Sequence, residues 1–285
     1  MNAPGTVDRY AVLGHPVAHS RSPAIHAAFA AQTGQLLDYG RLECPLNGFA
    51  DSVRRFAAGG ARGCNVTVPF KFEALALAAQ ASDRAQLAGA ANTLRFDADG
   101  WFADNTDGVG LVRDLEHNAS WPLAGRSLLL VGAGGASAGV LGPLLAARPA
   151  RLMLVNRTPD KATALVARHR DWAERHGVAL TAGSLGDAAL APAFDTVLNA
   201  SASSLAGAAS PVPARVLAPQ ALAVDLMYGA AAAPFLAWAV AAGAQGRDGL
   251  GMLVEQAAEA FLLWRGLRPD TAPVLRSLRM QVDGT

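Results

Sequence analysis

The residues with the clearest chemistry form a glycine-rich loop that follows an apolar run. The segment Leu-Leu-Leu-Val-Gly-Ala-Gly-Gly-Ala-Ser occupies positions 128–137. Gly132 permits a tight turn after a strand, and Gly134 lets the backbone approach a pyrophosphate group. A helix that starts here offers free N–H groups and a favourable dipole to that anion. Ser137 replaces the third glycine of the common fingerprint, but the strand–loop–helix setting favours a dinucleotide site over a purely structural turn.

The end of the next strand predicts which dinucleotide binds. NAD-binding folds usually place an acidic residue about 20 residues beyond the loop, where it holds the ribose 2′-hydroxyl. This chain carries Asn156 and Arg157 there, with Lys161 one turn later. The planar donor fork of Arg suits a phosphate, so the sequence favours NADP over NAD. The acidic residue Asp160 lies close by, which leaves NAD as an alternative. A second alternative is that Arg157 and Lys161 are ordinary surface residues.

Three polar clusters lie outside this nucleotide-binding segment. They are His19-Ser20-Arg21-Ser22-Pro23, then Asn-Val-Thr-Val-Pro-Phe-Lys at 65–71, and then 90–93 with Asp-Asn-Thr-Asp-Gly at 104–108. Taken one at a time, most of these residues have an ordinary structural explanation. Ser22 and Asp107 can each cap a helix that begins beside them, and a single Lys on a turn, such as Lys71, is usually solvated.

The elements that must position these residues follow from hydrophobic periodicity. Strands alternate with helices along the whole chain, which is typical of α/β folds. The expected strands are 9–13, 39–44, 64–68, 93–96, 101–103, 128–131, 152–155, 178–180, 196–198 and 223–226. The expected helices run from Ser22 to near Gly34 and over 49–58, 72–80, 108–117, the glycine loop to about 147, 159–176 and 250–264.

Composition sets further limits. The 285 residues are 52% hydrophobic and 16% charged, so we expect a folded protein with a large hydrophobic core. The formal net charge is +1, so we expect no nucleic-acid partner. Cys44 and Cys64 form no metal-ligand pattern, and their low number fits a reducing cytoplasm. We expect no signal peptide and no metal. The uncharged stretches 127–147 and 226–246 are long enough for membrane spans, but their glycines and alanines favour a strand, a loop and a helix.

The polar clusters and the glycine loop together resemble the motifs of the shikimate dehydrogenase family. The order is Ser-x-Ser-Pro, Asn-Val-Thr-Val-Pro-Phe-Lys, Ala-Asn-Thr, Asp-Asn-Thr-Asp-Gly, Gly-Ala-Gly-Gly-Ala-Ser, Asn-Arg-Thr and Asp-Gly-Leu-Gly-Met-Leu-Val-x-Gln. The resemblance runs from about Tyr10 to Pro273. It implies an enzyme of aromatic amino acid biosynthesis that reduces 3-dehydroshikimate to shikimate with NADPH.

The resemblance also implies a two-domain α/β fold with the active site in the cleft between the domains. Residues 1–106, joined by 249–285, would form the substrate domain, and 107–248 a Rossmann-type NADP domain. It implies a monomer or a homodimer whose only partners are small molecules.

The resemblance assigns a role to each matching residue. Lys71 and Asp107 would be the catalytic pair, with Lys71 as general acid or base. The expected substrate ligands are Ser20, Ser22, Thr67, Asn92, Tyr228 and Gln256. The expected cofactor contacts are Gly132, Ala133, Gly134, Gly135, Ala136, Asn156, Arg157, Thr158, Lys161, Ser201, Leu226 and Gly249, with Asp83 as a weaker contact.

Two departures from the family pattern affect the cofactor edge. Ser201 stands where the family often has Thr, and the loop after Tyr228 is Gly-Ala-Ala-Ala-Ala-Pro, without the usual Thr before Pro. The nearest alternative is a quinate/shikimate or amino-shikimate dehydrogenase. A methylenetetrahydrofolate dehydrogenase would not require the set of Lys71, Asn92 and Asp107. A non-catalytic ligand sensor on the same fold should have lost the Lys–Asp pair.

Overall fold

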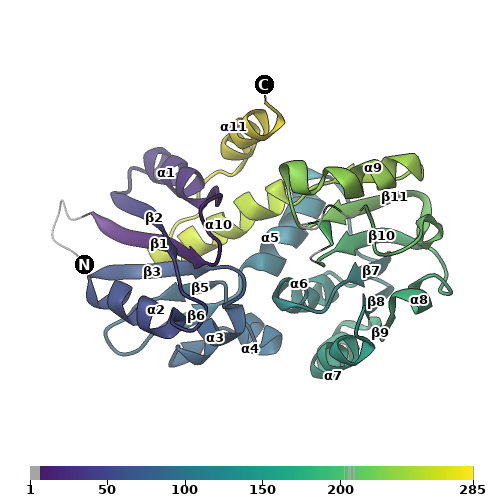
Figure 1. Cartoon of the computed structure of the whole chain (residues 1–285), viewed down its shortest axis with the longest axis horizontal. Helices are drawn as coiled ribbons and strands as arrows, with labels where there is room; N and C mark the ends of the chain where they lie inside the picture. The colour runs from purple at the N-terminus through teal and green to yellow at the C-terminus, as the bar shows by residue number, and fades with distance from the viewer. Residues whose placement is uncertain (1–6, 202, 205–206, 208, 285) are drawn as a thin grey trace. The chain divides into compact units, whose positions relative to one another are not determined.

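The computed structural model describes residues 7–201, 203–204, 207 and 209–284. The chain divides into two compact units, each drawn in Figure 1. Unit 1 comprises the residues up to Gly110 together with Leu253–Leu278. Unit 2 comprises Leu111–Met252 and the residues from Arg279 onward. Each unit contains one six-stranded sheet with helices, so the predicted α/β class is confirmed.

The sheet of unit 1 is mixed, in the order β2-β1-β3-β5-β6-β4. Strands β1, β2 and β3 are parallel, whereas β5 runs antiparallel to both β3 and β6. The strands are β1 (Asp8–Gly14), β2 (Leu37–Glu43), β3 (Ala61–Val66), β4 (Gln80–Ala81), β5 (Thr93–Arg95) and β6 (Phe102–Asp104). The helices are α1 (Ser22–Thr33), α2 (Phe49–Ala58), α3 (Lys71–Ala76) and α4 (Asp83–Ala88). Unit 1 also holds most of α10 (Leu250–Arg265) and of α11 (Ala272–Asp283).

Strand β1 is apolar and buried from Tyr10 onward, where helices cover both faces of the sheet (Figure 1). Ala11 and Leu13 point to the face covered by α2 and α3, where they pack with Phe49 and Phe70. Tyr10 points to the opposite face and stacks on Trp264 of α10, with ring centroids 4.6 Å apart. This burial on two faces accounts for the absence of polar–apolar alternation in the strand.

The sheet of unit 2 is entirely parallel, in the order β12-β11-β10-β7-β8-β9. The strand order reverses between β7 and β10, as in dinucleotide-binding folds. The strands are β7 (Ser127–Val131), β8 (Arg151–Asn156), β9 (Ala179–Ser184), β10 (Phe194–Asn199), β11 (Leu217–Asp225) and β12 (Gln245–Arg247). The helices are α5 (Asp107–Arg113), which begins in unit 1, α6 (Gly135–Ala146), α7 (Pro159–His176), α8 (Leu185–Ala188) and α9 (Ala233–Ala241).

Successive residues of β7 fill two separate cores in unit 2. Leu128 and Leu130 pack with α6 and α7, which lie side by side in Figure 1. Leu129 and Val131 pack on the other face with Phe235 of α9. Both sheet faces are therefore buried, which explains why the predicted strand is a continuous apolar run.

Several predicted boundaries were wrong because tertiary contacts override local propensity. The helix predicted over 72–80 ends at Ala76, since Ala79 and Gln80 donate backbone hydrogen bonds to the carbonyl of Trp101. The helix predicted over 108–117 starts at Asp107 and continues after Arg113 as a π-helical turn at Asp114–Asn118. The predictions also omitted α4, α8, β4 and β12.

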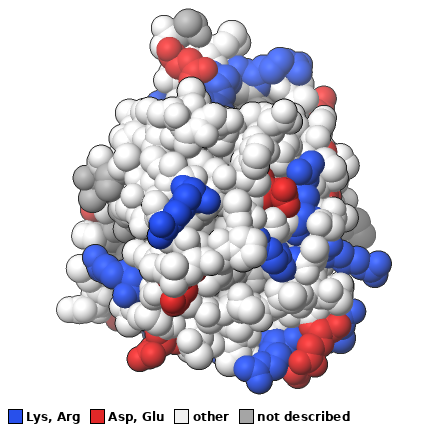
Figure 2. Space-filling view, turned by 90° about the vertical axis from the view of Figure 1, so that its right-hand side faces the viewer, with Lys and Arg blue, Asp and Glu red and all other residues white. Residues whose placement is uncertain are grey.

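None of the helices in the described part of the chain is long and apolar enough to span a membrane. The face drawn in Figure 2 carries Lys and Arg in small separate groups among uncharged side chains. This distribution agrees with the near-zero net charge of the sequence. The two cysteines are free and buried, and burial raises the pKa of the Cys44 thiol.

Candidate active site

A buried ion pair forms the chemical centre of unit 1. Lys71 is the first residue of α3 and Asp107 the first residue of α5, and Nζ donates to Oδ2 at 2.5 Å. The two side chains are 13% and 7% exposed, so the pair is shielded while the amine remains reachable. Among the described residues, the Asp107 carboxylate accepts from the side chains of Lys71 and Asn92 and from no backbone N–H of its own helix, so it does not act as a cap.

Two amide side chains complete this cluster. Nδ2 of Asn92 donates to Oδ1 of Asp107 at 2.8 Å and to Oε1 of Gln256 at 3.3 Å. Asn92 is 3% exposed and Gln256 8%. Gln256 comes from α10, whose backbone approaches α5 closely at Gly110. The structure therefore brings four of the predicted site residues together, although Asn92 and Gln256 are 164 positions apart.

Ser20 and Ser22 form a pair at the start of α1. Oγ of Ser20 donates to Oγ of Ser22 at 3.1 Å and accepts from the backbone N–H of Ser22 at 3.3 Å. The expectation that Ser22 caps the helix was wrong, because Arg21 occupies the N-cap position without a side-chain cap. With no capping role, the two hydroxyls are available to a ligand.

Thr67 follows β3 and its backbone N–H donates to the carbonyl of Leu13 at 2.8 Å. A Cβ on Gly14 would lie 2.4 Å from Cγ2 of Thr67, so only glycine fits at this point of β1. Among the described residues, no direct hydrogen bond joins Thr67 or the serine pair to Lys71, Asn92, Asp107 or Gln256.

The glycine loop of unit 2 has the geometry of a dinucleotide site. Gly132 has a φ of 108°, a conformation that favours glycine. A Cβ at Gly132 would lie 3.0 Å from Ala200 and Ser201, whereas one at Gly134 would meet nothing within 4 Å. Protein packing therefore explains the first glycine but not the second, and a ligand approaching the start of α6 explains the second. Gly135, at the start of α6, together with Ala133 and Ala136 makes up the rest of the loop.

The edge of this loop carries two exposed cations. Asn156 ends β8 and donates from Nδ2 to the carbonyl of Thr158 at 3.0 Å, which shapes the turn into α7. Arg157 precedes that turn and Lys161 lies in the first turn of α7, and both are exposed. Within the described part of the chain, neither cation is engaged in an ion pair. This donor set fits a phosphate on the ribose.

Three further predicted cofactor residues gather at the carboxyl ends of β10 and β11. Oγ of Ser201 donates to Oδ1 of Asn199 at 2.7 Å, and the backbone N–H of Leu226 donates to the carbonyl of Asn199 at 3.0 Å. A Cβ on Gly249 would lie 2.3 Å from the carbonyl oxygen of Leu226. Gly132 lies against Ser201, so these residues border the glycine loop.

A buried carboxylate that sequence reasoning missed organises this edge. Asp225 is fully buried and accepts from Ser204, from Nδ2 of Asn199 at 3.1 Å and from the N–H of Met227 at 2.8 Å. Burial raises the pKa of the Asp225 carboxyl, and the hydrogen bond from Ser204 opposes that rise. Its position at the end of a parallel strand was the feature that could have identified it.

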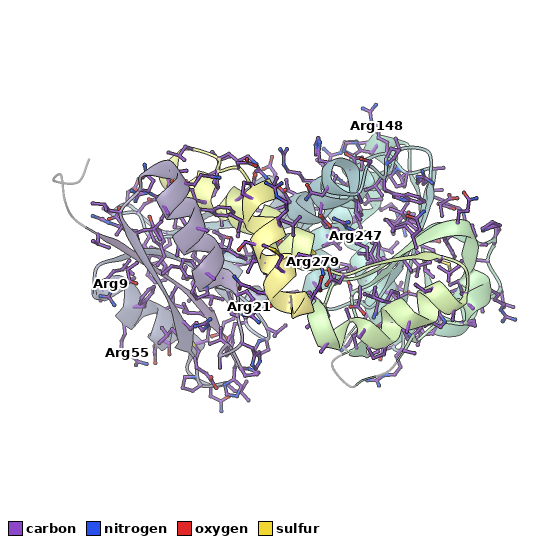
Figure 3. All side chains as sticks on the ribbon, turned by 90° about the horizontal axis from the view of Figure 1, so that it is seen from above. Arg9, Arg21, Arg55, Arg148, Arg247 and Arg279 are labelled. Atoms are coloured by element: carbon purple, nitrogen blue, oxygen red, sulfur yellow. The ribbon has the colours of Figure 1, made fainter. Side chains whose placement is uncertain are left out.

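Tyr228 lies in unit 2, at the start of the short helical turn Gly229–Ala231. The N–H of Gly229 donates to Oδ2 of Asp248 at 3.2 Å, and Asp248 is paired with Arg279 at 2.5 Å. Arg247 pairs with Asp114 on the same side of unit 2, where Figure 3 labels both arginines. The Asp248–Arg279 pair, through the N–H of Gly229, holds the loop that carries Tyr228. Asp83 belongs to unit 1, as the first residue of α4.

Sequence reasoning also missed the polar residues beneath the Lys71 cluster. Three buried residues are each hydrogen-bonded to Asn92. They are Asn65, which is 6% exposed, and Thr93 and Thr106, which are both 0% exposed. In the sequence, Thr93 is next to Asn92 and Thr106 is next to Asp107. This adjacency to predicted site residues was the signal that could have identified them.

Two family models match separate parts of the chain. The shikimate dehydrogenase substrate binding domain matches residues 12–94, and the shikimate 5′-dehydrogenase C-terminal domain matches residues 249–279. The shikimate dehydrogenase (NADP(+)) of Methylibium petroleiphilum is 65% identical over 283 residues, which cover 97% of this chain and 96% of that protein.

Solved structures show the same similarity. An Ael1 enzyme from Pseudomonas putida is 46% identical with a TM-score of 0.86, over 95% of this chain and 98% of that one. The shikimate 5-dehydrogenase of Thermus thermophilus, solved in complex with NADP(H) and shikimate, is 33% identical with a TM-score of 0.81. That match covers 96% of this chain and 99% of that one.

Proposed function

Because the chain belongs to the shikimate dehydrogenase family, we propose that it catalyses the reversible NADPH-dependent reduction of 3-dehydroshikimate to shikimate. The reaction is a step of the shikimate pathway of aromatic amino acid biosynthesis. The observation that carries the proposal is the cluster around the 2.5 Å contact between Lys71 and Asp107, with Asn92 and Gln256 beside it. We place the enzyme in the cytoplasm, as a monomer or a homodimer.

Lys71 handles the proton of the reaction. Reduction of the ring carbonyl leaves negative charge on its oxygen, and Nζ of Lys71 donates a proton to that oxygen. In the oxidative direction the same amine accepts the proton of the hydroxyl. Asp107 holds the amine by its hydrogen bond at 2.5 Å, so the proton carrier keeps one position through the cycle.

The remaining polar side chains of unit 1 bind the substrate. Shikimate carries a carboxylate and three hydroxyls, which need both donors and acceptors. Asn92 and Gln256 offer amides next to the ion pair, and Ser20, Ser22 and Thr67 offer hydroxyls. By the family resemblance, Tyr228 is a further proposed ligand of the substrate carboxylate.

Apart from Asp83, the proposed cofactor residues belong to unit 2. NADP, when bound, supplies or accepts the hydride. The N–H groups at the start of α6 hold the pyrophosphate, and Arg157 and Lys161 hold the 2′-phosphate with Asn156 and Thr158. Ser201, Leu226 and Gly249 border the nicotinamide.

The test is NADPH formation, followed by absorbance, with shikimate and quinate as substrates and with NADP and NAD as cofactors. Turnover with shikimate and NADP alone is the expected result. Comparable rates with quinate or NAD would retain the chemistry of Lys71 and broaden the specificity. No turnover with any pair would reject the enzymatic function and leave a ligand sensor as the alternative.

A further inference from the structure

A line of hydrogen bonds runs from the interior of unit 1 to the catalytic carboxylate. The hydroxyl of Tyr39 lies 2.7 Å from Oδ1 of Asn65, whose Nδ2 lies 3.0 Å from Oγ1 of Thr93. That oxygen lies 2.9 Å from Oδ1 of Asn92, and Nδ2 of Asn92 lies 2.8 Å from Oδ1 of Asp107. All five side chains belong to residues that are at most 8% exposed, so water does not compete for these bonds.

Two backbone groups fix the direction of every bond in this line. One side-chain amide atom of Asn65 lies 3.2 Å from the backbone carbonyl of Asn92. Because a carbonyl can only accept, this atom must be Nδ2, and Oδ1 of Asn65 must therefore face Tyr39. The backbone N–H of Thr106 can only donate, and it lies 2.8 Å from the atom of Asn92 that must therefore be Oδ1.

The hydroxyl proton of Thr93 follows from these two assignments. Its oxygen accepts from Asn65, and it donates to Asn92. Each donor thus points toward Asp107, and the last one, Nδ2 of Asn92, donates to Oδ1 of the Asp107 carboxylate.

From this geometry we propose that Thr93 is a positioning residue for the Lys71–Asp107 pair. Its hydroxyl orients the amide of Asn92, so that Nδ2 holds Oδ1 of Asp107 while Oδ2 remains for Lys71. Asn65 and Tyr39 orient Thr93 in turn. The kinetic part of this inference rests on the proposed function. Thr93 is 0% exposed, so it cannot act by touching the substrate.

Removal of the hydroxyl should therefore alter the pair through Asn92, although Thr93 itself does not touch the substrate. Thr93→Val keeps the shape of the side chain and leaves Asn92 without one of the donors to its oxygen. The loss of one net hydrogen bond of about 0.5–1.5 kcal/mol corresponds to a kcat reduced about two- to tenfold. Because Asn92 is also a proposed substrate ligand, the KM for shikimate should rise together with the fall in kcat. Thr93→Ser retains the hydroxyl and should recover most of kcat, and Tyr39→Phe should give a smaller loss.

The lysine content of the chain permits a direct readout of the pair. Lys71 and Lys161 are the only lysines in the sequence. Selective 13Cε-lysine labelling therefore gives two side-chain resonances in an NMR spectrum. In Thr93→Val the Lys71 resonance should move, and the Lys161 resonance in unit 2 should not.

The decisive experiment combines this spectrum, kcat, KM and the midpoint of thermal unfolding for wild type, Thr93→Val, Thr93→Ser and Tyr39→Phe. A shifted Lys71 resonance with reduced kcat in Thr93→Val, reversed in Thr93→Ser, supports the inference. An unmoved Lys71 resonance overturns it, even if Thr93→Val is less stable or slower. Should Thr93→Val not fold, Tyr39→Phe is judged by the same spectrum. An inactive wild type would reject the proposed function, while the spectrum would still decide the positioning role.

Discussion

The amine of Lys71 and the carboxylate of Asp107 lie 2.5 Å apart although 36 positions separate them in the chain. The pair depends on two helix starts, since Lys71 begins α3 and Asp107 begins α5. Both side chains are largely buried. This relationship makes the pair the first target for mutation.

Replacing Lys71 should remove catalysis while leaving binding largely intact. Lys71→Met keeps the length of the side chain and deletes the proton carrier, so kcat should fall about 10²- to 10⁴-fold. The dissociation constant for shikimate, measured by calorimetry, should change much less. Lys161→Met is the matched control, because it removes the other lysine and should leave kcat at saturating cofactor near normal. Wild-type turnover in Lys71→Met would exclude the proton-transfer role.

Arg157 should determine the preference for NADP. The residue is exposed and, in the described structure, has no carboxylate partner, which leaves its donors free for a phosphate. Arg157→Ala should raise the KM for NADP by about tenfold or more, the usual size of a charge-assisted interaction. The KM for NAD and the kcat at saturation should hardly change. Arg168→Ala, which removes an exposed arginine of the following helix α7, is the control. An equal rise in KM for NAD would show that Arg157 does not recognise the 2′-phosphate.

Gly110 should be required for the position of Gln256. A Cβ at Gly110 would lie 2.6 Å from the backbone nitrogen of Gln256 and 2.7 Å from its Cβ, so α5 and α10 would have to separate. We expect Gly110→Ala to lower the free energy of unfolding by about 1–3 kcal/mol, as overpacking does, and to raise the KM for shikimate. Urea denaturation and steady-state kinetics measure the two effects. Gly40→Ala is the control, since a Cβ there meets nothing within 4 Å. Equal stability of the two variants would contradict the prediction.

The sequence predicted the local parts of this molecule better than the contacts between distant segments. The glycine loop could be predicted because a turn with positive φ and a helix start are encoded within about ten residues. The family resemblance predicted four site residues that the structure brings together, namely Lys71, Asn92, Asp107 and Gln256. Their roles in the reaction stay predictions until variants such as Lys71→Met are assayed.

The supporting residues could not be identified in this way. Thr93 and Asn65 look like ordinary strand residues, and their role depends on the orientation of the Asn92 amide. The backbone N–H of Thr106, which lies in another segment, donates to the same Asn92 oxygen as the Thr93 hydroxyl does, so the orientation depends on a contact between distant residues. The helix predicted over 72–80 was wrong for a similar reason, because the N–H groups of Ala79 and Gln80 donate to the carbonyl of the distant residue Trp101. Such contacts exist only after the sheet has formed.

His26 should make the protein sensitive to acid. Its ring is fully buried, stacked 4.2 Å from the ring of Tyr39, and within the described residues neither ring nitrogen has a hydrogen-bond partner. Burial lowers the pKa of His26 from 6.5 to about 3. A lowered pKa in the folded state means that the neutral ring contributes stability above about pH 6.5, and that this stability is lost as the pH falls toward about 3.

The expected loss between about pH 7 and pH 5 is about 2 kcal/mol in the free energy of unfolding. His26→Phe keeps a stacked ring that cannot be protonated, so its stability should change less over this interval. Urea denaturation of both proteins at the two pH values measures the difference. His169, whose pKa is also lowered by burial, is present in both proteins and cancels. His19→Gln, which replaces an exposed histidine, should lose as much stability as the wild type. An equal loss in wild type and His26→Phe would show that this ring is not the acid-sensitive group.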